Sequence, residues 1–284
     1  MNILSLFDGI SCGRVALERA GIEVDNYYAS EMDEHAIKIS RKNYPDIKQI
    51  GNVLNVDATK LGKIDILMAG SPCQGFSFAG KQLAFDDPRS KLFFEFIRIM
   101  KECKPTYFIL ENVKMKQEFL DVISELVGLH PILINSNLVS AQNRQRYYWT
   151  NIPNVGFPYD PEAEKLLLMD ILQDEDEVNE KYWASEKMRQ NYDGGKYLNS
   201  KYTSQGNRIH DIESKSPTIC AGSHGYANGY VHIDEVRKLT PTECERLQTL
   251  PDGYTELCIS DTQRYKALGN GWTVDVIAHI LRQI

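Results

Sequence analysis

Short apolar runs that end in glycine-bearing or polar turns repeat through the first half of the chain. Residues 3–7 predict a buried strand, and Val15, Leu17 and Ala20 have helical spacing up to Gly21, a typical helix end. Further strands are predicted at 24–29, 47–50, 64–69, 107–110 and 132–138, with helices at 33–43, 92–100 and 117–127. Strands that alternate with helices predict an α/β fold on a mostly parallel sheet.

This rhythm is lost between residues 153 and 236. The acidic run after Pro161 carries a leucine cluster and predicts one helix with a solvated acidic face, and the glycine- and tyrosine-rich sequence beyond it predicts loops and short strands. Pro241 opens another helix, and residues 271–284 predict a helix beside the first strand. We therefore expect a catalytic domain of residues 1–152 and 237–284, and a second domain of residues 153–236.

Composition is that of a globular protein, with 284 residues, 42% hydrophobic and 25% charged. The net charge of −7 argues mildly against a nucleic-acid partner. However, residues 160–180 hold nine acidic residues against Lys165, so a basic face elsewhere stays possible. No apolar run is long enough for a membrane span, and Asp8 comes too early for a signal peptide, so we expect a cytoplasmic protein.

Six cysteines show neither paired nor zinc-like spacing, so we expect reduced thiols and no metal. Cys73 follows the strand 64–69 and a Gly-Ser-Pro turn, which would present its thiol at the carboxyl edge of the sheet, where open α/β folds bind ligands. The alternative is a buried cysteine that acts as a small apolar side chain.

Acidic residues, Glu31 and Glu111, come after two other predicted strands. Glu31 lies about 20 residues beyond the first glycine turn, where nucleotide-binding folds place a ribose-binding acid. The turn lacks the Gly-x-Gly-x-x-Gly pattern that binds pyrophosphate, which favours a nucleoside without phosphates. A solvated acid at a strand end is the alternative interpretation of Glu31.

A thiol, a carboxyl group and two arginines are predicted at the same edge. Glu111 ends the strand 107–110, and Arg144 and Arg146 follow the strand 132–138. A guanidinium near Cys73 would favour its thiolate, and a carboxyl group that protonates a ring nitrogen would make an adjacent ring carbon open to thiolate attack.

Six ordered blocks resemble those of the DNA cytosine-5 methyltransferases, almost from end to end. They lie at residues 7–13, 70–77, 111–113, 142–146, 238–247 and 268–272. The sequences at 92–96 and 146–149 are also similar to the catalytic domain of the animal de novo enzymes. The resemblance implies a Rossmann-like S-adenosylmethionine-dependent methyltransferase sheet with a small, loop-rich target recognition domain at residues 153–236.

The resemblance also implies S-adenosylmethionine as methyl donor and a cytosine flipped out of double-stranded DNA as acceptor. Cys73 would add to C6 of the ring, and Glu111 would hold N3 and the exocyclic amine. Arg144 would steady the base, with Gln142 and Arg146 in support. The implied cofactor residues are Phe7, Asp8, Gly9, Gly13, Glu31, Met32, Asn52, Val53, Pro72, Leu92, Asn270 and Trp272. The implied DNA contacts are Ser77, Arg89, Lys91, Gln205, Arg208 and Thr218.

Two positions depart from the family pattern. Asn52 stands where an aspartate usually meets the adenine amino group, and Met32 stands where an aromatic residue is frequent. An amide oxygen still accepts a hydrogen bond and a thioether still covers a ring, so neither change removes a reacting group. Residues 74–91 are charged and rich in helix breakers; they form either a plain surface loop or, by resemblance, a lid over the flipped base.

Three other functions share part of this pattern. A cytosine methyltransferase that acts on transfer RNA would carry the same blocks, whereas a non-catalytic DNA-binding relative would have lost reacting groups that this chain keeps. A nicotinamide-dependent oxidoreductase would explain Glu31 but not the cysteine block. We expect a bacterial nucleoid-associated or phage-encoded enzyme, acting either alone or beside a separate restriction endonuclease.

Overall fold

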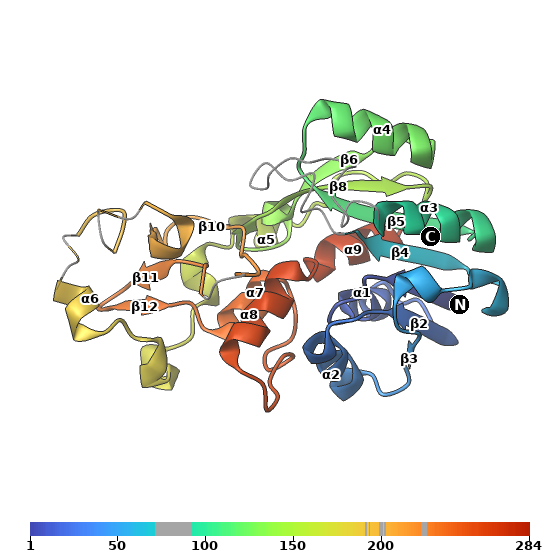
Figure 1. Ribbon diagram of the computed structural model, residues 1–284. Helices are drawn as coiled ribbons and strands as arrows, with labels where there is room; N and C mark the ends of the chain where they lie inside the picture. Colours follow the sequence, from blue (N-terminus) through green and yellow to red (C-terminus); the bar gives the residue numbers. More distant parts are fainter. Residues whose placement is uncertain (72–91, 191, 193, 199–200, 202, 223–225) are drawn as a thin grey trace. The chain divides into compact units, whose positions relative to one another are not determined.

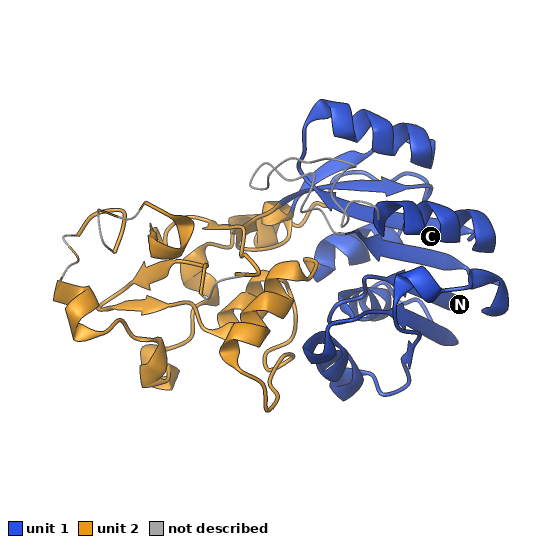
Figure 2. Cartoon of the chain, viewed as in Figure 1, with its two compact units in different colours: residues 1–135, 145–157, 274–284 blue, residues 136–144, 158–273 orange. Residues whose placement is uncertain are grey.

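The computed structural model describes residues 1–71, 92–190, 192, 194–198, 201, 203–222 and 226–284. Two compact units divide the chain (Figure 2). Unit 1 comprises residues 1–135, 145–157 and 274–284, and unit 2 comprises residues 136–144 and 158–273. Each unit is therefore assembled from separate stretches of sequence.

Unit 1 is built on one mixed sheet, in which seven strands lie among the described residues (Figure 1). These strands are β1 (Asn2–Leu6), β2 (Asn26–Ser30), β3 (Lys48–Gln49), β4 (Ile66–Gly70), β5 (Tyr107–Val113), β6 (Ile132–Asn135) and β8 (Gln145–Thr150). Their spatial order is β3-β2-β1-β4-β5-β8-β6, with β8 antiparallel to both neighbours and the pairs from β3 to β5 parallel. The order reverses beside β1, the point where open α/β sheets bind ligands.

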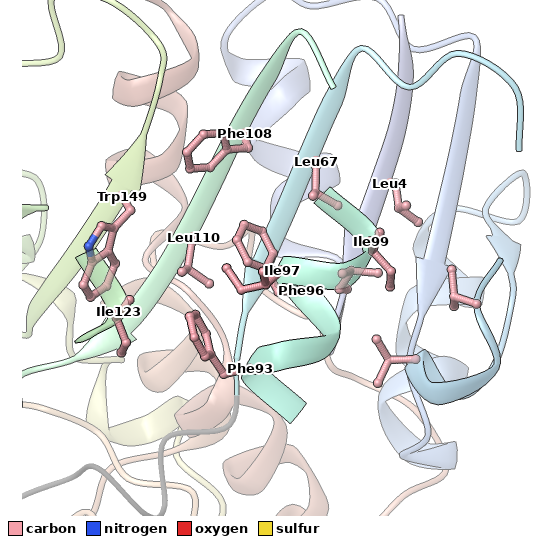
Figure 3. Packing of buried hydrophobic residues seen from close by; sticks show 14 of the residues in the cluster. Leu4, Leu67, Phe93, Phe96, Ile97, Ile99, Phe108, Leu110, Ile123 and Trp149 are labelled. Carbon is pink, nitrogen blue, oxygen red and sulfur yellow. The ribbon is translucent and has the colours of Figure 1, made fainter. Parts of the chain in front are cut away.

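One large apolar cluster of unit 1 lies on one face of this sheet. The helices of the unit are α1 (Cys12–Arg19), α2 (Glu34–Asn43), α3 (Leu92–Cys103), α4 (Gln117–Val127) and α9 (Val274–Leu281). Side chains alternate between the two faces of a strand, so Leu67 and Leu110 point to the same side. Phe93 and Phe96 of α3 pack with them in one buried cluster (Figure 3). Helix α3 therefore covers β4 and β5.

The opposite face carries α1. Met68 alternates with Leu67, and its Cε would lie 2.7 Å from a Cβ built on Gly13 of α1. Helix α9 packs against α1, and Arg19 Nη1 forms an ion pair with Asp275 Oδ1 at 2.7 Å. A helix made at the end of the chain thus completes a unit that begins with its first strand.

Unit 2 consists of short strands and helices. Its strands are β7 (Gln142–Asn143), β9 (Ile209–His210), β10 (Ser216–Pro217), β11 (Tyr230–His232) and β12 (Val236–Lys238), and its helices are α5 (Pro161–Lys165), α6 (Glu186–Gln190), α7 (Pro241–Leu247) and α8 (Asp261–Asn270). One small sheet has the order β12-β11-β9, and β7 pairs with β10. Arg237 and Glu243 form a fully buried ion pair, with Nη2 and Oε1 2.8 Å apart. Buried polar pairs therefore supplement a small apolar cluster, composed of Ala184, Leu198, Tyr230 and Val236.

The prediction of one helix in the acidic run is wrong. Helix α5 ends at Lys165 and is followed by separate 3₁₀ turns, Leu168–Ile171 and Glu175–Glu177. The N–H groups of Leu168 and Met169 donate to the carbonyls of Ser214 and Ile212, each at 2.9 Å. Pairing with this other segment replaces the hydrogen bonds that a continuous helix would need.

The predicted domain boundaries also differ from the two units. Residues 237–273 and 136–144, which the prediction places in the catalytic domain, group with unit 2. The final helix begins at Val274, not at the predicted Gly271. It packs on α1, the helix that directly follows the first strand. The assignment of target recognition to residues 153–236 stays a prediction.

The described part of the chain shows neither a membrane-spanning helix nor a metal-binding cluster. There, no helix is long and apolar enough to cross a membrane. The same residues contain no group of three or more histidine, cysteine, aspartate or glutamate side chains that could hold a metal ion.

Replacing Phe96 tests the packing of α3 on the sheet. Phe96→Ala removes a fully buried ring from the core, so we expect the free energy of unfolding to fall by about 3–5 kcal/mol in urea titration. Phe94→Ala is the matched control, because Phe94 lies on the same helix but is 40% exposed, and its loss should be below about 1 kcal/mol. Equal losses in the two variants would contradict this packing.

Candidate active site

The loop after β1 has left-handed backbone at several residues, and it is hydrogen-bonded to a carboxylate that follows the neighbouring strand β2. Phe7, Gly9 and Ser11 have φ values of 56°, 61° and 62°. Only glycine adopts this conformation at little cost, and strained residues of other types concentrate at ligand-binding sites. Glu31 Oε2, at the end of β2, accepts the N–H of Gly9 at 2.8 Å. The structure therefore brings together the predicted cofactor loop and the predicted ribose acid.

The remaining acceptor capacity of Glu31 fits a ribose. Glu31 Oε1 accepts the N–H groups of Met32 and Asp33 at 2.7 and 2.8 Å. A carboxylate has about four acceptor positions, so three backbone donors leave one for a hydroxyl group.

The apolar and amide groups of the same strand ends fit an adenine ring. Met32 is 62% exposed, and Phe7 is half-buried against the core of unit 1. Asn52 Oδ1 accepts the N–H of Leu54 at 3.0 Å and retains a second lone pair. By contrast, the side chains of Val53 and Leu92 belong to or pack on the apolar core. A nucleoside is thus compatible with the described part of the predicted pocket.

The pKa of Asp8, a residue of this loop, is raised. Its carboxylate accepts hydrogen bonds from the hydroxyl groups of Ser11 at 2.5 Å and Tyr27 at 2.7 Å. Burial raises the pKa of Asp8 from 3.8 to about 6, although these two hydroxyl groups stabilise the carboxylate and offset part of the rise. Asp8 therefore acts within the protein as an anchor for the loop.

Glu111 and Arg146 form the second constellation of unit 1. In the register of β5 and β8, Glu111 lies opposite Tyr148, and Arg146 lies two residues away on the same face of the sheet. Arg146 Nε is 2.9 Å from Glu111 Oε1, and both side chains are largely buried. The ion pair holds the carboxylate near the carboxyl end of β5, which continues to Val113 and not only to the predicted end at Leu110.

The adjacent strand, β4, ends beside this carboxylate. Gly70 is the register partner of Glu111, and Asn112 Nδ2 donates to Ser71 Oγ at 3.0 Å. Five predicted site residues lie outside the described residues: Pro72, Cys73, Ser77, Arg89 and Lys91. The predicted lid at 74–91 lies outside them as well.

Arg144 and Gln142 belong to unit 2, where they contact backbone. The guanidinium of Arg144 donates to the carbonyls of Ile219, Gly269 and Gly271 at 3.3, 3.1 and 2.9 Å. Gln142 is fully buried, and its Oε1 accepts the N–H of Ile219 at 2.9 Å. Arg144 thus fixes the end of α8 and the residue after it, next to Asn270 and Trp272, whereas Gln142 fixes the backbone at Ile219.

The three described DNA-contact candidates meet at one polar pocket within unit 2. Gln205, Arg208 and Thr218 line a pocket of about 470 Å³. Gln205 Nε2 donates to the carbonyl of Thr218 at 2.8 Å, and Thr218 Oγ1 donates to the carbonyl of Asn143 at 2.7 Å. Donors and acceptors at a pocket wall are suited to nucleic-acid groups.

Sequence reasoning missed several residues around these candidates. Asn143, His210 and Lys215 also line the polar pocket. Gln248 is fully buried and donates to backbone carbonyls at the end of α8. Gln248 directly follows the sequence block at 238–247, and this proximity to the block is the sequence feature that could have identified it.

Comparison with known proteins places the whole chain in one group. The family model described as C-5 cytosine-specific DNA methylase matches residues 1–284. The chain is 32% identical to Type II methyltransferase M1.ScrFI of Lactococcus lactis subsp. cremoris, over 100% of this chain and 77% of that protein. It is also 32% identical to Type II methyltransferase M.NlaX of Neisseria lactamica, over 100% of this chain and 96% of that protein. Among solved structures, Entamoeba histolytica methyltransferase EhMeth aligns with a TM-score of 0.80 at 18% identity, covering 100% of this chain and 97% of that one, which confirms the predicted fold.

The raised pKa of Asp8 predicts a pH dependence of stability. Between about pH 4 and pH 6 the folded chain holds the Asp8 proton, whereas the unfolded chain has released it. The contribution of Asp8 to the free energy of unfolding should therefore fall as pH rises through this window and stay constant above it.

The same prediction is checked by NMR and by unfolding. The ¹³C signal of the Asp8 carboxyl should titrate with a midpoint near 6, and Tyr27→Phe should raise the midpoint because it removes a hydrogen bond to the carboxylate. The difference in unfolding free energy between wild type and Asp8→Asn should follow the same window. A midpoint near 4 would show that burial does not control this group.

Proposed function

Since the chain belongs to the C-5 cytosine-specific DNA methylase family, we propose that it transfers a methyl group from S-adenosylmethionine to C5 of a cytosine in a short duplex DNA motif. The family is one of S-adenosylmethionine-dependent cytosine methyltransferases. One observation carries the proposal for this chain. Glu111, paired with Arg146, is held at the end of β5 beside the end of β4, and the sequence after β4 continues to Cys73.

The proposed reaction begins with nucleophilic addition. The Cys73 thiolate forms a bond to C6 of a flipped-out cytosine while Glu111 protonates N3, so that C5 becomes an enamine carbon. C5 then takes the methyl group, which S-adenosylmethionine supplies as an electrophile, leaving S-adenosylhomocysteine. Loss of the C5 proton to water, return of the N3 proton and cleavage of the C6–S bond release 5-methylcytosine and the thiolate.

Arg146 and Arg144 contribute differently to this proposal. Arg146 orients the carboxylate of Glu111 through the 2.9 Å ion pair. Arg144 supports the site through the backbone carbonyls that it binds, in addition to the predicted role of steadying the base.

Glu31 binds the ribose hydroxyl groups of the cofactor with its remaining acceptor position. Phe7 and Met32 cover the adenine ring, and Asn52 meets its amino group. Asp8, Gly9 and Gly13 shape the loop, and Val53 and Leu92 support the pocket from the core. Pro72, Asn270 and Trp272 are further cofactor residues by resemblance.

DNA recognition is proposed for the loop-rich sequence at 153–236. Gln205, Arg208 and Thr218 contact DNA from the polar pocket of unit 2. Ser77, Arg89 and Lys91 are proposed as further contacts on sequence grounds. A separate restriction endonuclease as functional partner also stays a prediction.

Bisulfite sequencing tests the proposed function directly. The chain expressed in a methylation-free host should leave 5-methylcytosine at one short motif, and Cys73→Ala should abolish the modification. Unmodified DNA in the presence of abundant folded protein would contradict the proposal, and 5-methylcytosine in transfer RNA instead would support the alternative substrate.

Replacing Glu111 tests the acid. Glu111→Gln keeps the size of the side chain but removes the carboxyl group that would transfer a proton to N3, so we expect kcat to fall by about 10²-fold or more in a tritiated methyl-transfer assay. Glu118→Gln, at an exposed position on α4, is the matched control and should retain normal turnover. Near-normal turnover in Glu111→Gln would remove the acid role.

A further inference from the structure

The end of helix α8 is held by buried side chains in addition to the backbone N–H of Gly271, which donates to the carbonyls of Ala267 and Leu268. The last four carbonyls of a helix lack donors within it. Here, Gln248 Nε2 donates to Leu268 O at 2.7 Å and to Gly271 O at 3.1 Å. Arg144 Nη2 donates to Gly269 O at 3.1 Å and to Gly271 O at 2.9 Å. The segment 268–271 is therefore fixed by an amide and a guanidinium from two distant parts of unit 2.

The orientation of the Gln248 amide is itself determined. Its Oε1 accepts a hydrogen bond from Thr273 Oγ1 at 2.9 Å and from Gln142 Nε2 at 3.3 Å. Its Nε2 must then face the two carbonyls, because they only accept. Gln248 is 0% exposed and Thr273 2% exposed, so water cannot replace these hydrogen bonds without entering the interior.

The other side of the segment has no spare volume. A Cβ at Gly269 would lie 2.2 Å from the backbone nitrogen of Ala221. The segment is thus confined between backbone on one side and the buried amide on the other. Asn270 remains exposed within it, and Trp272 is 9% exposed.

We propose that Gln248 and Thr273 are positioning residues for the cofactor, which act by holding Asn270 and Trp272 in the conformation that binds it. This inference rests on the proposed function, because the cofactor roles of Asn270 and Trp272 come from the resemblance. Neither positioning residue touches the reacting atoms. Their loss should weaken cofactor binding without changing the chemical step.

Calorimetry on the full chain tests the inference. Gln248→Met keeps the side-chain volume but removes both donors, and we expect the Kd for S-adenosylmethionine to rise about tenfold. Thr273→Val should raise it about threefold, whereas Thr273→Ser, which keeps the hydroxyl group, should stay within about twofold. Gln173→Met is the matched control, since Gln173 bonds to Thr240 and not to this segment.

Two further measurements separate positioning from stability. At saturating S-adenosylmethionine, kcat and the KM for DNA should change by less than about twofold in Gln248→Met. Hydrogen exchange of the Gly271 amide, measured without cofactor, should accelerate in Gln248→Met and Thr273→Val but not in Gln173→Met.

The outcomes distinguish this inference from the proposed function. A wild-type chain that binds no S-adenosylmethionine would overturn both. A wild type that binds it, with Gln248→Met or Thr273→Val unchanged in Kd although Gly271 exchanges faster, would overturn the positioning role alone. If Gln248→Met does not fold, Thr273→Val decides the question.

Discussion

Parallel pairing of β1, β2, β4 and β5 is the constraint on which the arrangement of unit 1 depends. Parallel strands end at the same edge of a sheet, so a loop and two carboxylates far apart in sequence lie along that edge. The register then sets their neighbours: Gly9 lies beside Glu31, and Gly70 beside Glu111. The antiparallel strand β8 adds Arg146 diagonally to Glu111. The contacts of Glu31 and Glu111 in unit 1 therefore follow from the pairing of its strands.

Unit 2 adds a second kind of interaction to its buried apolar residues. Fully buried polar side chains connect its segments, as Glu243 does with Arg237 and with the N–H of Thr240. Removing one member of such a pair leaves an unpaired buried charge, which costs about 3–5 kcal/mol. Directional hydrogen bonds specify the positions of loops more sharply than apolar contact does, and the segment after α8 benefits from this precision.

Sequence alone predicted the α/β fold and the position of Glu31, which directly follows β2. It placed Glu111 just after a strand, whereas β5 continues through Glu111 to Val113, because pairing with β8 extends the strand. It could not assign partners across strands: the roles of Arg144 and Arg146 depend on the direction of β8 and on which unit each residue joins. The acidic run does not form one helix because the N–H groups of Leu168 and Met169 donate to the carbonyls of Ser214 and Ile212. Hydrophobic periodicity does not reveal partners so distant in sequence. The role of Gln248 was not predicted for a similar reason, since the carbonyl groups that it binds lie 20 or more residues away in sequence.

The pairing of α1 with α9 has a consequence for biosynthesis. Helix α1 is translated near the start of the chain and α9 only after the whole of unit 2. All seven described strands of the sheet end by Thr150, so at about 5–20 residues per second the stretch from there to Val274 takes about 6–25 s to translate. During that interval the side of α1 that α9 covers is exposed and accessible to a chaperone. Unit 1 therefore forms in two steps, first its sheet and later its last helix.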